Sequence, residues 1–156
     1  MEKTVRRKPS ENSILTLTNR SDILFVTVCT RNRGPLLAND DMCILITEAW
    51  AAAVHWLVGR YVIMPDHIHF FCSPNTTDPN LKAWIAYWNR LVTQSDGSEA
   101  RGFWQSGFWD TQIRTGRAYE EKWQYVRHNP VRKGLAVVPE EWPYQGELNE
   151  LRWFGP

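Results

Sequence analysis

Apolar residues recur with two different periods along the chain, and these periods predict the order of its elements. Residues 23–30 (ILFVTVCT) are β-branched and aromatic, which is typical of a central strand. Apolar residues at 45, 49, 52 and 56 share one face of a helix that Asn39 can cap and that is expected to end near Gly59. Shorter apolar stretches predict strands over residues 61–64, 67–72 and 108–114.

Two later segments have the helical period. Apolar residues follow Asn80 in a single stripe at positions 81, 84, 85, 88, 91 and 92, and a polar loop is expected over 94–102. A third helix is predicted over 118–128, ending before Pro130. This order indicates an α+β fold: a ferredoxin-like (palm or RRM-like) antiparallel sheet with helices on one face, plus an extra helix.

Length and composition favour one globular domain. The chain has 156 residues, of which 43% are apolar and 22% charged. We expect a basic N-terminal arm over 1–13, the main domain over 14–138 and an irregular tail rich in Trp and Pro over 139–156. Its apolar runs are too short to span a membrane and its three cysteines form no CxxC pair, so a soluble, cytoplasmic protein with reduced thiols is expected.

Positive charge is concentrated in two segments although the formal net charge is only +1. Residues 1–33 carry seven Lys/Arg, and residues 114–133 carry six against two Glu. This distribution suits phosphate binding, and it also suits two ordinary solvated surfaces. Seven residues in these two segments are the candidate contacts to phosphate, as on a DNA strand if the ligand is a nucleic acid: Arg6, Arg7, Lys8, Arg114, Arg127, Arg132 and Lys133. Trp104, Phe108 and Trp109 are expected to be core residues, with base stacking as the alternative.

A pair of histidines, His67 and His69, is the first candidate for chemistry. Residues i and i+2 of a strand point to the same side, so the two imidazoles lie together. Neighbouring neutral imidazoles suit a divalent metal, although such a pair can also be structural. Asp66 either makes a turn, which its place after Pro65 favours, or orients a histidine.

A tyrosine and an asparagine one helical turn apart form the second candidate. Tyr119, Trp123 and Val126 mark the buried stripe of the third helix, and Tyr125 lies about 100° from its nearest edge. Asn129 follows on the same side as Tyr125. Tyr125 is therefore a surface residue or a nucleophilic phenol beside a metal-binding amide. A phenol with a pKa near 10 gains from a metal that polarises the group it attacks.

Four motifs in order resemble those of a known family. YVIMPDHIHFF (61–71) resembles the His-hydrophobic-His motif of HUH single-strand nucleases, and YVRHNPVRKGL (125–135) resembles the catalytic-tyrosine segment of REP-associated tyrosine transposases. WQSGFWDTQIR (104–114) and EWPYQGEL (141–148) are also similar to that family. The resemblance covers roughly residues 20–148.

The resemblance implies a metal-dependent endonuclease and strand transferase that acts on single-stranded DNA near hairpins of palindromic repeats. The implied ligands of Mg²⁺ or Mn²⁺ are His67, His69 and Asn129. Tyr125 would attack the phosphodiester and form a 5′-phosphotyrosine link. A bacterial-type cytoplasmic protein with a nucleoid-associated substrate, as monomer or homodimer, is expected.

Other functions stay open beside this one. A domesticated member of the family would bind DNA hairpins without cutting them, although the complete set of His67, His69 and Tyr125 argues against this. A histidine-triad nucleotide hydrolase would need a third His at position 71, which is Phe71. An RNA-binding ferredoxin-like domain would leave the His pair idle. Family members commonly carry a lysine where this chain has Asn89, which puts one phosphate contact in doubt.

Overall fold

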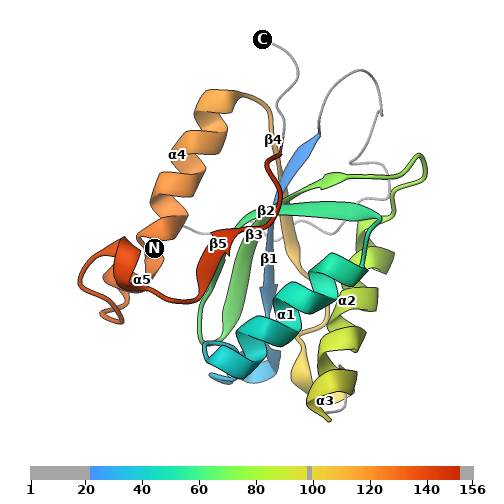
Figure 1. The fold of residues 1–156 in the computed structure, drawn as a ribbon, viewed down its shortest axis with the longest axis horizontal. Coiled ribbons are helices and arrows are strands. Elements are labelled where there is room, and N and C mark those ends of the chain that lie inside the picture. The colour runs from blue at the N-terminus through green and yellow to red at the C-terminus, as the bar shows by residue number, and fades with distance from the viewer. Residues whose placement is uncertain (1–21, 98–99, 152–156) are drawn as a thin grey trace.

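An antiparallel sheet forms the centre of the molecule (Figure 1). The computed structural model describes residues 22–97 and 100–151, and within them the sheet has five strands in the order β4-β1-β3-β2-β5. These strands are β1 (Ile23–Cys29), β2 (Trp56–Ile63), β3 (His67–Pro74), β4 (Trp109–Ile113) and β5 (Gln145–Glu147). The first four have the ferredoxin-like order, so the predicted fold class is confirmed.

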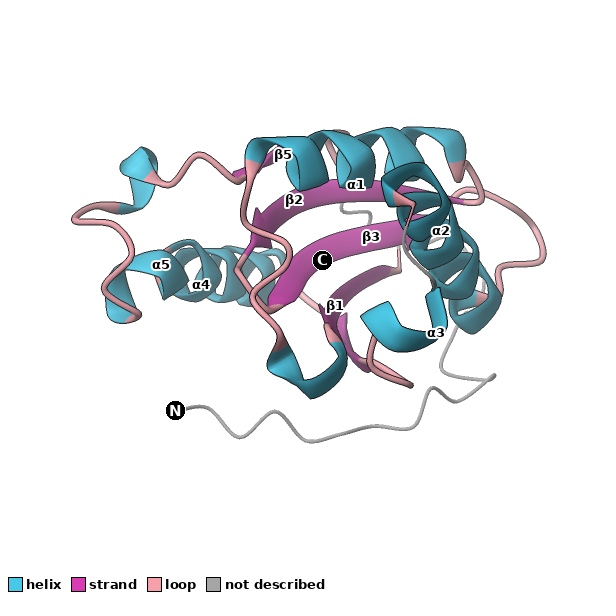
Figure 2. Cartoon of the chain, turned by 90° about the horizontal axis from the view of Figure 1, so that it is seen from below, coloured by secondary structure: helices cyan, strands magenta, loops and turns pink. Residues whose placement is uncertain are grey.

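Helices cover both faces of this sheet. Helices α1 (Asp40–Ala52) and α2 (Leu81–Asp96) lie side by side on one face, and the short α3 (Ala100–Phe103) follows α2 (Figure 2). Helix α4 (Gly116–Arg127) stands apart from this pair, on the left of Figure 1, and leads into the single turn of α5 (Asn129–Arg132). Helix α4 is therefore the extra helix that the sequence predicts.

Side-chain alternation on β3 separates two apolar clusters. Ile68, Phe70 and Cys72 are fully buried under α1 and α2, in the larger cluster. Phe71 points the other way into a smaller cluster, which also contains Phe25 and residues of α4. His67 and His69 share the face of Phe71, because residues two apart on a strand point to the same side. The α1–α2 face thus holds most of the core, and the α4 face holds the candidate chemistry.

The predicted end of the first helix is wrong. Asn39 caps α1 as expected, accepting a hydrogen bond from the Met42 N–H at 2.9 Å, but the helix ends at Ala52 rather than near Gly59. Trp56, which was expected on the helical face, begins β2 instead. It is 1% exposed in the larger cluster, because the segment after Ala53 pairs with β3 along its length. Sheet pairing outweighs the helical spacing of its apolar residues.

Two segments that were expected to be irregular contain regular structure. Helix α2 continues to Asp96 and ends at Gly97, whose φ of 79° is readily adopted by glycine, and α3 follows within the expected loop. The tail forms β5, which pairs with β2 opposite Arg60, Tyr61 and Val62. The core prediction for Trp104 and Phe108 is confirmed, since both are buried, whereas Trp109 is partly exposed on β4.

Some predictions lie outside the described residues. These include the basic arm, with Arg6, Arg7 and Lys8, and the last residues of the tail, with Trp153 and Phe154. None of the helices in 22–97 and 100–151 has the length and apolar character that crossing a membrane requires.

Arg60 on β2 fastens α4 to the sheet. Its guanidinium lies 5.5 Å from the ring centre of Tyr119 and 5.4 Å from that of Trp123. It also pairs with Glu120 of α4 at 3.1 Å and with Glu147 of β5 at 3.5 Å. Such contacts hold the helix that carries Tyr125 against the same face as the histidines.

Candidate metal and nucleic-acid site

His67 and His69 place two imidazoles side by side on β3. Their ring centres are 4.6 Å apart and the ring planes meet at 78°. His67 is buried and His69 is partly exposed. The predicted juxtaposition of the pair is therefore present in the fold.

A carboxylate orients His67. Asp66 Oδ1 lies 2.7 Å from His67 Nδ1, and Asp66 Oδ2 accepts a hydrogen bond from Arg33 Nε at 2.8 Å. The hydrogen bond to His67, followed by that to Arg33, holds the pKa of Asp66 far below its ordinary value, so the carboxylate is ionised. In the tautomer that donates a hydrogen bond from Nδ1–H to the ionised Asp66, the lone pair of His67 is on Nε2. The orienting role that the sequence left open for Asp66 is the one its contacts support.

The opposite strand holds His69. Thr27 of β1 lies directly across the ladder, and its Oγ1 is 2.8 Å from His69 Nδ1. The ring of Phe25 stacks on His69 with centres 5.3 Å apart. Burial, and then the positive charges of His67, Lys122, Arg33 and Arg132, lower the pKa of His69 well below its ordinary value. His69 is therefore neutral at neutral pH, the form in which imidazole binds a metal.

Asn129 is the third candidate ligand beside the two histidines. It is the first residue of α5, is 9% exposed, and its Nδ2 lies 3.3 Å from His67 Nε2. Turning the amide by 180° would present Oδ1, a metal-binding oxygen, to the same nitrogen. Within the described residues, no group of three or more His, Cys, Asp or Glu is arranged to hold a metal ion. A metal at the His pair would therefore use an amide ligand, and the two imidazoles and Asn129 fit that requirement.

Tyr125 lies on the exposed side of α4, as the helical spacing predicts. It is 42% exposed, and the guanidinium of Arg132 lies over its ring at 3.9 Å. The charge of Arg132 also acts on His69. Arg132 therefore contacts the phenol ring and contributes to the lowered pKa of His69, although Tyr125 itself makes no hydrogen bond to either imidazole.

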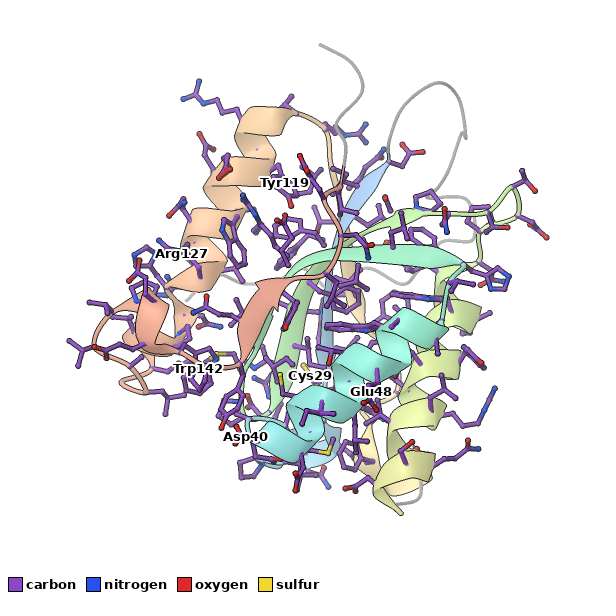
Figure 3. All side chains as sticks on the ribbon, in the orientation of Figure 1. Cys29, Asp40, Glu48, Tyr119, Arg127 and Trp142 are labelled. Carbon is purple, nitrogen blue, oxygen red and sulfur yellow. The ribbon has the colours of Figure 1, made fainter. Side chains whose placement is uncertain are left out.

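The predicted basic residues differ in exposure and in whether they already pair with an acidic side chain. Arg114, Arg132 and Lys133 are exposed. Arg127 instead pairs with Glu140 and also donates to Gln124 at 3.2 Å. Figure 3 shows Arg127 near the end of α4 that leads into α5, with Tyr119 nearer the other end. The first three can contact phosphate directly, whereas Arg127 would have to leave Glu140.

Three residues of the site escaped the sequence-based reasoning. Arg33 and Thr27 contact the histidine system from β1 and the turn after it, and Lys122 of α4 lies 5.0 Å from the ring centre of Phe25. Only strand register could have revealed Thr27, since it faces His69 across 42 residues of sequence. Conversely, Asn89 lies on α2, which packs on the opposite face of the sheet from the His pair. Its departure from the family pattern leaves this site unchanged.

Comparison with solved structures finds a protein with a similar fold. In a solved structure of a REP-associated tyrosine transposase bound to a REP hairpin, the match covers 93% of this chain and 82% of that one, with a TM-score of 0.70 and 21% identity. The chain therefore has the α+β fold of that protein.

Sequence comparison finds similarity to proteins of the same name. The chain is 32% identical over 102 residues to a REP-associated tyrosine transposase of Haemophilus influenzae, covering 58% of each protein. It is 26% identical over 88 residues to that of Escherichia coli K12, covering 56% of this chain and 52% of the relative. The matches thus span little more than half the length of these curated relatives. No protein-family model matches the chain. The chain is thus similar in sequence to REP-associated tyrosine transposases, as its motifs predict.

Proposed function

We propose that this protein is a metal-dependent endonuclease and strand transferase for single-stranded DNA, acting beside hairpins of palindromic repeats. The observation that carries this proposal is the meeting of His67 and His69 of β3 with Asn129 of α5, with His67 held by Asp66 so that Nε2 is available. The solved relative bound to a REP hairpin supports a hairpin substrate.

The residues of the chain divide the chemistry among them. His67, His69 and Asn129 would hold Mg²⁺ or Mn²⁺. When bound, the metal would polarise the scissile phosphodiester and offset its charge. Arg132 and Lys133 would bind the phosphates that flank it. The phenol oxygen of Tyr125 would attack phosphorus, form a 5′-phosphotyrosine bond and release the 3′-oxygen as a hydroxyl. Attack by a 3′-hydroxyl on that link would rejoin strands and restore the phenol.

The proposal is tested by trapping the covalent intermediate. A labelled single-stranded hairpin is incubated with the protein and Mn²⁺, and the adduct is detected on a denaturing gel. Tyr125→Phe removes one oxygen and should eliminate the adduct while hairpin affinity is unchanged. Tyr87→Phe is the matched control, because Tyr87 is 41% exposed and also lies under an arginine, Arg90. It should leave the adduct intact.

The metal role is tested in the same assay. His67→Ala and EDTA should each abolish the adduct and leave hairpin binding in place, because binding depends on phosphate contacts. An adduct that persists in EDTA, or in Tyr125→Phe, contradicts the mechanism. Hairpin binding by the wild type without any adduct would instead favour the alternative, a non-cleaving hairpin-binding module.

A further inference from the structure

Two turns at the edge of the site are tied together. Buried Thr30 bonds to Asp66 O through its backbone N–H at 3.0 Å and its Oγ1 at 3.1 Å, and Oγ1 also lies 2.8 Å from Gly34 O. The N–H of Leu37 donates to Pro65 O at 2.9 Å. The turn after β1 is therefore fixed on the turn that precedes His67.

The first of these turns has an unusual backbone. Asn32 and Arg33 both have φ of 56°, in the left-handed region that favours glycine. Such conformations cluster at sites where the surrounding structure enforces them. Here the result is that the Arg33 side chain reaches back over the second turn. Its Nε donates to Asp66 Oδ2 at 2.8 Å, and its Nη2 lies 3.3 Å from His67 Nδ1.

The geometry points to Arg33 as a positioning residue: it holds Asp66 against His67, so that Nδ1 carries the proton and Nε2 faces Asn129 with its lone pair free. The inference rests on the proposed function, because only a metal bound at His67 would need a bare Nε2. Arg33 does not touch Nε2, so it acts on the candidate metal-binding nitrogen indirectly, through Asp66 and through its own contact with Nδ1.

The two oxygens of the Asp66 carboxylate have different partners, which explains how Arg33 positions His67. Arg33 occupies Oδ2, and His67 occupies Oδ1. The Asp66 side chain is 27% exposed, so without Arg33 it can rotate toward water. Nδ1–H would then lose its fixed acceptor, and the imidazole would populate both neutral tautomers. In one of them Nε2 carries the proton and cannot bind a metal.

Arg33→Gly is the sharpest test, because glycine adopts the positive φ without a side-chain clash and the turn should still fold. With ¹⁵N-labelled histidine, long-range ¹H–¹⁵N spectra of the metal-free protein report which nitrogen of His67 is protonated. The wild type should show a protonated Nδ1 and a bare Nε2. Arg33→Gly should shift both nitrogens toward averaged values and weaken Mn²⁺ binding about tenfold in an EPR titration.

Two further variants separate positioning from a general effect of charge. Arg33→Lys keeps the charge and can still pair with Asp66, so it should recover part of the wild-type tautomer and affinity. Arg117→Ala removes an exposed arginine of α4 that pairs with Glu121, and should change neither.

Each outcome has a separate meaning. Unchanged His67 nitrogen shifts in Arg33→Gly would overturn the inference. A wild type that binds no Mn²⁺ would contradict the proposed function, while the nitrogen shifts would still decide the role of Arg33. If Arg33→Gly does not fold, Arg33→Gln, which removes the charge, replaces it in the test. His67 nitrogen shifts like those of the wild type in Arg33→Gln would overturn the inference, and averaged shifts would support it.

Discussion

Thr27→Val is a near-isosteric change that removes only the hydroxyl beside His69. Thr27 is 6% exposed on β1, and its Oγ1 is 2.8 Å from His69 Nδ1. Valine suits a strand as well as threonine does, so backbone and packing should be retained. The variant thus isolates the hydrogen bond that orients His69, the second candidate ligand.

The magnitude follows from two opposing terms. Leaving the part-buried ring nitrogen of His69 without its hydrogen-bond partner costs about 1–3 kcal/mol. The methyl group that replaces the hydroxyl returns up to about 0.8 kcal/mol. We expect a net loss of about 1 kcal/mol in the free energy of unfolding. With a urea m-value of about 2 kcal/mol/M for a domain of this size, the midpoint should fall by about 0.5 M.

Repeating the urea titration with Mn²⁺ separates stability from metal binding. At a concentration of 100 times the wild-type Kd, the metal should stabilise the wild type by about 2.7 kcal/mol. A loss of about tenfold in affinity would reduce that gain to about 1.4 kcal/mol in Thr27→Val. Thr111→Val, at an exposed position of β4, measures the effect of the same substitution on a strand without a histidine contact. Equal Mn²⁺ stabilisation of wild type and Thr27→Val would refute the reasoning.

Two further predictions concern α4 and the basic surface. Burial raises the pKa of Tyr119 to about 12, so the folded state favours the neutral phenol. The free energy of unfolding should therefore be constant below pH 10 and fall by about 1–2 kcal/mol between pH 10 and 12. Urea titrations of Tyr119→Phe should show a smaller decline over this range. An equally steep decline in Tyr119→Phe would assign it to other groups. Replacing Arg114 and Lys133 with glutamine should reduce the slope of log K against log salt for a single strand by about 1.4, whereas Arg117→Gln should not. An unchanged slope would remove both from the DNA surface.

The sequence predicted a side chain's direction best where that direction depends on the period of a single strand or helix. The His-x-His spacing on β3 and the position of Tyr125 off the apolar stripe of α4 each depend on a single period, and both predictions agree with the structure. The end of α1 was mispredicted because Trp56 fits a helical face equally well. Its actual place depends on pairing with Pro74 of β3, 18 positions along the chain.

The supporting contacts of the site were harder to predict because they depend on tertiary register. Thr27 meets His69 only because β1 and β3 pair in one particular alignment. Arg33 reaches Asp66 only because two consecutive residues adopt a positive φ, for which the RNRGP segment contains no glycine at the required positions. Asn129 was identified by its spacing from Tyr125, yet its contact with His67 depends on how α4 docks on the sheet.

The alternation on β3 explains why the site can be both well supported and open to a substrate. Ile68, Phe70 and Cys72 are each 0% exposed beneath α1 and α2, so the strand is anchored by its other face. This leaves the face of His67 and His69 free to carry polar groups, which would be costly in a core that needed both faces. Helix α4 covers only part of this face and is fastened there by Arg60. The α5 turn that follows it can therefore bring Asn129 to His67 while Tyr125 stays exposed, as the proposed attack of Tyr125 on a long polymeric substrate requires.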